Sequence, residues 1–185
     1  MSEQFHELTL GACHRRLPIV AVAPGVRIAF MDIVGDIELM DAALQALLGK
    51  APAGFEVILG GDTVGMVIAH HLALLSGKPY VVARKKRTPV MTNPLTAEAQ
   101  SVAAGSPSTF WLGEHQAARL RGRHVLIVDE VTSTGSTLRA LHELAVLAGA
   151  SEVTRSVIAT EGTRRDDVLS VAHLPVWTGE EEGRP

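Results

Sequence analysis

Two neighbouring carboxylates, Asp129 and Glu130, lie between an apolar run at 125–128 and a turn at 131–137 that is rich in hydroxyl side chains. Leucines and alanines at helical spacing follow this turn. The pattern predicts a buried strand, a small-residue loop and a helix. Such a loop can bind a phosphate through backbone N–H groups and the positive end of the helix dipole. Since carboxylates accept hydrogen bonds from sugar hydroxyls, the pattern favours a phosphate beside a ribose diol. An ordinary strand–turn–helix corner with solvated acids is the alternative.

The elements that would position these groups alternate along the chain. Apolar runs predict strands at 57–59, 80–83, 124–129 and 153–159, with a fifth candidate at 173–177. Helical spacing predicts helices from Asp36 to Gly49 and from Val64 to Gly77. Strands that read as continuous apolar runs and alternate with helices indicate a parallel sheet covered on both faces. Ligands bind such sheets at the carboxyl ends of the strands, where all the chemically notable segments fall: 60–65, 84–87, 129–137 and 160–162.

Residues 125–137 resemble the phosphoribosyl pyrophosphate (PRPP) signature of the type I phosphoribosyltransferases, in which two acids precede a Thr-Gly-x-Thr turn. The resemblance implies that Asp129 and Glu130 act in catalysis by holding the two ribose hydroxyls. The family usually has Asp at the second position, so Glu130 is a longer variant. The turn implied to bind the 5′-phosphate comprises Ser133, Thr134, Gly135, Ser136 and Thr137.

The segment before the first predicted helix is similar to the start of the adenine phosphoribosyltransferases. Pro-Gly at 24–25 and Phe-Met-Asp-Ile at 30–33 resemble their Pro-Gly and Phe-Arg-Asp-Ile residues, with two extra residues here. The resemblance implies that Phe30 stacks on the base and that the backbones of Ala29 and Met31 read its edge. A phenylalanine in an apolar run can equally be a core residue.

Two further loops resemble the family's pyrophosphate-binding elements. The residues implied to bind PRPP in the first loop are Gly61, Asp62, Thr63, Val64 and Gly65. Adenine enzymes commonly carry Arg in place of Val64. The second loop opens with four consecutive cations, of which Arg84 is implied to act in catalysis and Lys85 in PRPP binding. A solvated basic patch is the alternative. Because the family's arginine often reaches the neighbouring subunit's site, a homodimer is implied.

Between Arg84 and Phe110 the sequence has little periodicity and many Pro, Gly, Ser and Thr residues. We predict a flexible lid at 85–110; a surface excursion with a short helix at 96–104 is the alternative. Adenine enzymes carry Glu-Tyr-Gly late in this lid, where the acid is thought to help protonate the base. The corresponding residues near 105–107 are Gly-Ser-Pro. Glu161, which follows the fourth predicted strand, is therefore a candidate for contacting the base.

The resemblance implies an α/β fold of the type I phosphoribosyltransferase kind, with a parallel β-sheet flanked by helices and a small hood from the N- and C-terminal segments. We expect a hood segment at 1–35, a core at 36–178 and a disordered acidic tail at 179–185.

The composition of the 185-residue chain excludes several classes of protein. Its net charge of −3 gives no general attraction to nucleic acid or to an anionic membrane. The single cysteine excludes an internal disulfide framework and fits a cytoplasmic protein. We expect neither a signal peptide nor a membrane span. The eight histidines form no metal-binding pattern, so no protein metal site is predicted; Mg²⁺ would be held mainly by PRPP and water.

These features predict an enzyme of purine salvage that transfers the phosphoribosyl group of PRPP to a purine-type base, giving a nucleoside 5′-monophosphate and pyrophosphate. Two alternatives remain. Val64 and the missing lid carboxylate favour a non-catalytic, PRPP-binding regulatory protein of the same fold. An unrelated nucleotide-phosphate enzyme on a similar sheet is the other. The sequence leaves the identity of the base open.

Overall fold

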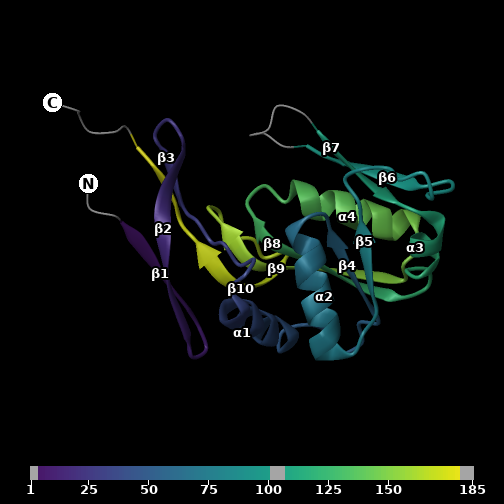
Figure 1. Ribbon diagram of the computed structural model, residues 1–185, viewed down its shortest axis with the longest axis horizontal. Coiled ribbons are helices and arrows are strands. Elements are labelled where there is room, and N and C mark those ends of the chain that lie inside the picture. The colour runs from purple at the N-terminus through teal and green to yellow at the C-terminus, as the bar shows by residue number, and fades with distance from the viewer. Residues whose placement is uncertain (1–3, 101–106, 180–185) are drawn as a thin grey trace.

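The computed structural model, in which residues 4–100 and 107–179 are described, is built around a five-stranded sheet (Figure 1). The strand order is β10-β9-β8-β4-β5, and every neighbouring pair is parallel. These strands are β4 (Val57–Gly61), β5 (Tyr80–Ala83), β8 (His124–Thr132), β9 (Glu152–Glu161) and β10 (Leu169–Leu174). The predicted α/β class is confirmed.

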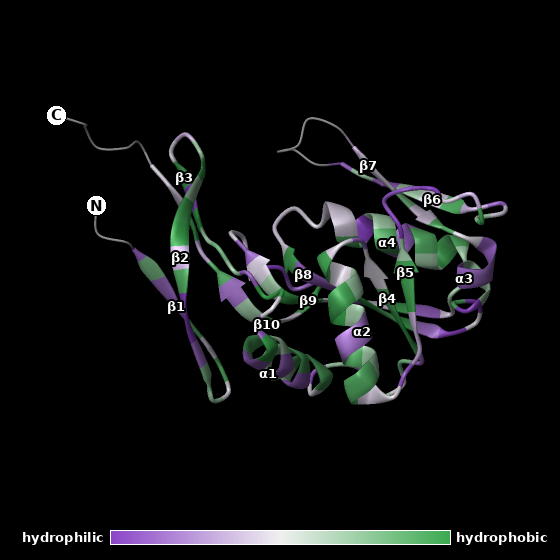
Figure 2. Cartoon of the chain, viewed as in Figure 1, coloured by the Kyte–Doolittle hydropathy of each residue, from purple (hydrophilic) through white to green (hydrophobic). Residues whose placement is uncertain are grey.

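Helices cover both faces of this sheet. The helices α1 (Ile37–Leu48) and α2 (Val64–Ser76) pack on one face, where Ile58 is buried. The helix α4 (Ser136–Leu147) packs on the other face, over Val57 and Leu59. Because both faces are covered, the strands are apolar at consecutive positions, as the green central strands in Figure 2 show. None of the helices in the described part of the chain is long and apolar enough to cross a membrane.

The segment predicted as a lid, 85–110, contains regular structure. Strands β6 (Leu95–Ala99) and β7 (Ser108–Leu112) form an antiparallel hairpin that packs on α4, followed by the short helix α3 (Glu114–Ala118). The alternative of a helix from residue 96 is wrong, because residues 96–99 are extended. The buried residues of β6 are alanines, so the alternation of apolar and polar side chains that indicates a strand is weak in its sequence. The middle of the lid, 101–106, lies outside the described residues.

The hood is a separate antiparallel sheet that joins the two ends of the chain. Its strands, in order, are β1 (Phe5–Leu10), β2 (Cys13–Ala23), β3 (Val26–Ala29) and β11 (Val176–Thr178). The single strand predicted at 173–177 is instead two, because Pro175 separates β10 from β11 and has no N–H for either sheet. Of the predicted tail, only Gly179 is described.

An arginine fastens the hood to the central domain. Arg15 of β2 donates to both carboxylate oxygens of Asp36, over 2.7 and 2.9 Å, and to Glu38 over 2.7 Å. Asp36 also caps α1 by accepting from the N–H of Leu39, and the Arg15 guanidinium lowers the pKa of Asp36. The segment 30–35 is therefore held between β3 and a capped helix.

Candidate functional site

The two acids lie within β8 rather than at its end. The strand predicted at 124–129 extends to Thr132, because residues 129–132 continue to pair with β9. Pairing with β4, on the other side, ends where Gly60 meets Val128. The backbone beside Asp129 and Glu130 is therefore supported on one side only. The other side opens toward the loop that follows β4.

Burial makes both acids reluctant to ionise. It raises the pKa of Asp129 to about 6, opposed by a hydrogen bond from the Glu130 N–H, over 2.9 Å, and by the charge of Lys85. Burial also raises the pKa of Glu130 to about 7, opposed by the Ile33 N–H and reinforced by the charges of Asp129 and Asp32. A ligand that donates hydroxyl hydrogen bonds would stabilise the ionised forms of these carboxylates.

The turn after β8 presents a helix start without a side-chain cap. Gly135 has a φ of 76°, in the left-handed region that favours glycine, and α4 begins at the next residue. Within the described residues no side chain caps α4 or α2, whereas Asp36 caps α1. The first N–H groups of α2 and α4 are thus not occupied by capping side chains, and each helix start can accept an anion.

The loop between β4 and α2 lies directly against the acids, and its glycines make this approach possible. A first side-chain carbon on Gly65 would lie 3.2 Å from the Val128 oxygen and 3.4 Å from Asp129 Oδ1. One on Gly60 would overlap the Gly65 carbonyl. The Asp62–Thr63 peptide is cis. The glycines place backbone groups at the start of α2 next to the carboxylate of Asp129.

Two residues that follow β5, Arg84 and Lys85, contact the same loop. Asp62 Oδ1 lies 3.5 Å from Arg84 Nη1, and Asp62 Oδ2 accepts from the Lys85 N–H over 3.1 Å. The charge of Lys85 acts on the pKa of Asp129. These contacts bring together the loops that follow β4, β5 and β8, and Thr160 of β9 pairs with Thr132 of β8. Lys86 and Arg87 are exposed farther along the chain, as Arg84 and Lys85 also are.

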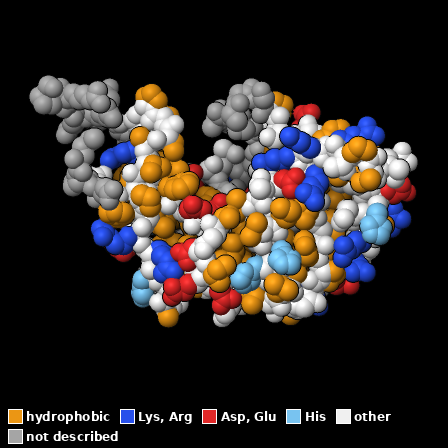
Figure 3. All heavy atoms as spheres, viewed as in Figure 1, with side chains coloured by type: hydrophobic (Ala, Val, Ile, Leu, Met, Phe, Trp, Pro, Cys, Tyr) orange, Lys and Arg blue, Asp and Glu red, His pale blue; other side chains and the backbone are white. Residues whose placement is uncertain are grey.

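The side facing the hood presents an aromatic ring. Phe30 is 47% exposed, whereas its neighbours Ala29 and Met31 are buried. Phe30 is therefore not a core residue, which removes the alternative reading of this position. Figure 3 shows a hollow between the hood and the central domain, with acidic and hydrophobic side chains along its floor.

Glu161 lies at the end of β9, on the side where the hood begins. It pairs with Leu174, and the N–H of the next residue, Gly162, donates to the Leu174 carbonyl over 3.0 Å. Gly162 approaches Val176, which pairs with Ile28 of β3. Partial burial raises the pKa of Glu161. The end of β9 that carries Glu161 is thus linked through Val176 to β3, the strand that precedes Phe30.

Sequence reasoning missed two arginines at the turn 133–137. Arg139 of α4 and Arg165 of the β9–β10 loop both donate to the Thr134 carbonyl, over 2.8 and 3.0 Å. The pair Arg164-Arg165, close behind a strand end, was the available signal.

Comparison with known proteins identifies the family. Residues 35–173 match the family model of the phosphoribosyl transferase domain. The chain belongs to the phosphoribosyltransferase family. Among curated relatives, the adenine phosphoribosyltransferase of Mycobacterium marinum is 32% identical over 163 residues, covering 85% of this chain and 84% of that protein. The adenine phosphoribosyltransferase of Nocardia farcinica is 31% identical over 139 residues, covering 73% of this chain and 69% of the relative.

Solved structures support the same phosphoribosyltransferase fold. The adenine phosphoribosyltransferase of Thermoanaerobacter pseudethanolicus superposes with a TM-score of 0.64 at 20% identity, covering 92% of this chain and 95% of that chain. The enzyme of Giardia lamblia, complexed with 9-deazaadenine, gives 0.65 at 21% identity, covering 79% and 87%. The resemblance to type I phosphoribosyltransferases is therefore confirmed at the level of fold and family.

Proposed function

We propose that this phosphoribosyltransferase transfers the phosphoribosyl group of PRPP to a purine base in purine salvage, releasing pyrophosphate and a nucleoside 5′-monophosphate. Family membership and the relatives named adenine phosphoribosyltransferase support this function. The observation that carries it is the pair of acids on the open side of β8, flanked by two helix starts without side-chain caps within the described residues. Two anionic groups beside one diol are what PRPP offers.

In this proposal each loop has one task. Asp129 and Glu130 hold the ribose hydroxyls, and the turn 133–137 binds the 5′-phosphate. The amides of 61–65, with Arg84 and Lys85, bind the leaving pyrophosphate. As the bond from C1′ to pyrophosphate breaks, positive charge develops on the ribose, and the nearby Asp129 carboxylate stabilises it. Catalysis is thus positioning and electrostatic stabilisation, without a protein nucleophile.

The base would lie between the exposed ring of Phe30 and the end of β9. Stacking on Phe30 orients the purine, while the backbones of Ala29 and Met31 read its edge. Of the lid positions 105–107, only Pro107 is described, and the sequence has no carboxylate there. Glu161, whose pKa is raised by burial, is the candidate that supplies a carboxyl to the base. Adenine is the first base to test, because the relatives are named for it.

Magnesium would enter this site bound to PRPP. Across residues 4–100 and 107–179, no group of three or more His, Cys, Asp or Glu side chains could hold a metal. In this proposal Mg²⁺ is held mainly by PRPP and water oxygens, beside the carboxylates of Asp129 and Glu130. When bound, it neutralises charge on the pyrophosphate. A cytoplasmic location stays a prediction of the sequence.

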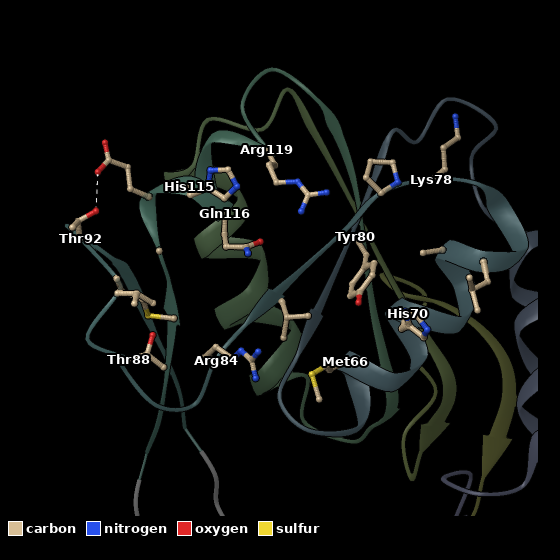
Figure 4. A pocket seen from close by; sticks show the side chains of 18 of the residues that line it. Met66, His70, Lys78, Tyr80, Arg84, Thr88, Thr92, His115, Gln116 and Arg119 are labelled. Atoms are coloured by element: carbon tan, nitrogen blue, oxygen red, sulfur yellow. Dashed lines mark hydrogen bonds between the residues drawn. The ribbon is translucent and has the colours of Figure 1, made fainter.

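A homodimer is the proposed assembly, and the edge of the central sheet at β5 is the surface that supports it. A cavity of about 1210 Å³ lies along this edge and includes Tyr80 and Arg84 in its lining (Figure 4). Leu74 and Val90, on the same surface, are 72% and 87% exposed. A second copy that covers these apolar side chains would also approach Arg84, at the entrance to the pyrophosphate loop.

The test is to incubate the protein with PRPP, Mg²⁺ and a panel of purine and non-purine bases and to measure pyrophosphate release. Release with at least one purine supports the transferase. Binding of PRPP without release from any base would instead indicate the regulatory protein. A competition of PRPP against simple nucleotides exposes the third class, since an unrelated nucleotide enzyme would not prefer PRPP. Sedimentation at several protein concentrations tests the dimer.

A further inference from the structure

Two guanidinium groups contact the turn 133–137, which is proposed to bind the 5′-phosphate. Arg139 Nη1 and Arg165 Nη1 both donate to the carbonyl of Thr134. Arg139 belongs to the helix that the turn begins, so its contact is local. Arg165 comes from a different loop, 31 residues farther along the chain. Two positively charged donors thus share one peptide carbonyl.

Arg165 is itself fixed in place. Its guanidinium forms two hydrogen bonds with Asp167, over 3.1 and 2.8 Å, and lowers the pKa of that carboxyl. Asp167 also lies 3.2 Å from Arg155 Nη2 of β9. The guanidinium packs against Gly135 so closely that a first side-chain carbon there would lie 2.7 Å from Arg165 Nη1. The side chain of Arg165 therefore occupies the space that the glycine leaves open.

These contacts act on the same peptide that would bind the phosphate. The Thr134 carbonyl and the Gly135 N–H belong to one peptide group, and they point in opposite directions. Cationic donors on the carbonyl fix the plane of this peptide and polarise it, which makes its N–H a stronger donor to an anion on the other side. Because Arg165 contacts the carbonyl side of this peptide, it would act through the peptide rather than by touching a phosphate on the N–H side.

We propose that Arg165 is a positioning residue for the 5′-phosphate: it locks the Thr134–Gly135 peptide with its N–H group toward the ligand. The inference rests on the proposed function, since it assumes that the turn binds the 5′-phosphate. It also couples two parts of the site. The loop that carries Arg165 begins just after Glu161, so the end of β9 that faces the base is joined to the phosphate turn.

The test measures ligand affinity by calorimetry for wild type and Arg165→Gln, using ribose 5-phosphate and pyrophosphate as separate probes. We expect the substitution to weaken ribose 5-phosphate about tenfold, the usual effect of losing a charged hydrogen bond. Pyrophosphate, which would bind at 61–65, should keep its affinity. In steady-state kinetics the KM for PRPP should rise while the KM for the base stays unchanged.

Arg164→Gln is the matched control, because it removes the same charge from an exposed neighbour in the same loop. It should bind ribose 5-phosphate like wild type. Arg165→Lys should show an intermediate loss, since one ammonium can reach the carbonyl but cannot also form the paired contact with Asp167. If Arg165→Gln unfolds at the assay temperature, the lysine variant decides by the same measurements.

Three results would overturn the inference alone: Arg165→Gln binding ribose 5-phosphate like wild type, an equal loss in Arg164→Gln, or an equal loss of pyrophosphate affinity. A wild-type protein that binds neither ribose 5-phosphate nor PRPP would overturn the proposed function, and this inference with it. The two failures are therefore distinguishable from the wild-type titration.

Discussion

Replacing Asp129 with asparagine should stabilise the free protein while it weakens substrate binding. The pKa of this buried carboxyl is about 6 in the folded protein, against 3.8 for an unperturbed group. The folded state binds the proton more strongly, so this group's contribution makes the protein less stable as the pH rises between these two values. Above about pH 6 the full cost, about 3 kcal/mol, is present.

Asparagine removes the buried charge and keeps an oxygen that can accept from the Glu130 N–H. We therefore expect Asp129→Asn to raise the free energy of unfolding near neutral pH by up to ~3 kcal/mol, and to change it little well below pH 3.8, where aspartate is protonated in both states. A hydroxyl donor to a charged acceptor contributes about 1.5–3 kcal/mol, so the affinity for PRPP should fall roughly 10- to 150-fold. Turnover should fall by orders of magnitude, because the cationic transition state loses its counter-charge.

Urea unfolding near neutral pH and well below pH 3.8, together with PRPP titration by calorimetry, measures both effects. Wild type should itself lose PRPP affinity as the pH falls through about 6, and the variant should lack that component. A variant that is less stable than wild type near neutral pH would refute the assignment of a costly buried charge. Unchanged PRPP affinity and turnover would refute the role of Asp129 at the ribose.

Three further substitutions test the other parts of the site. Gly65→Ala places a carbon 3.2 Å from the Val128 oxygen, so pyrophosphate affinity should fall and the crowding should lower stability by about 1–3 kcal/mol. Calorimetry with pyrophosphate and thermal unfolding measure these effects, and unchanged values for both would count against close packing of this loop. Phe30→Ala should raise the KM for the base about tenfold and change the melting temperature little, because base stacking contributes about 1–3 kcal/mol. A large loss of stability with a normal KM would mean that the ring is structural. Arg84→Gln should raise the inhibition constant of pyrophosphate, the product, about tenfold and leave the affinity for ribose 5-phosphate unchanged. Equal inhibition of variant and wild type by pyrophosphate would place this cation outside the pyrophosphate site.

Much of the framework could be predicted because its signals are local. The helix α1 begins after Asp36 and ends before Gly49, as its apolar spacing and flanking residues indicated. The strand β5 has the bounds that its apolar run predicted. Each of these elements carries enough information within about a dozen residues to define its own period. Once these strands are predicted, the positions of the site loops can be predicted too, since parallel strands bring their carboxyl ends to one edge of the sheet.

What could not be predicted depends on partners distant in the sequence. The extension of β8 through Glu130 to Thr132 is a consequence of pairing with β9 on one side only. The strand β6 buries only alanines, and its partner β7 is separated from it by several residues of the chain. Arg165 reaches Thr134 through folding of the β9–β10 loop, and no local pattern specifies which carbonyl a surface arginine will contact.

The position of β11 in the hood has a consequence for the order in which the site can assemble during synthesis. The acids, the turn 133–137 and Arg165 are all in place once the β9–β10 loop has folded, whereas β3, which leads into Phe30, gains its second neighbour only when residues 176–178 have left the ribosome. A nascent chain could thus capture a sugar phosphate before it can seat a base. Shortening the chain before Val176 should for the same reason impair recognition of the nucleobase more than that of PRPP.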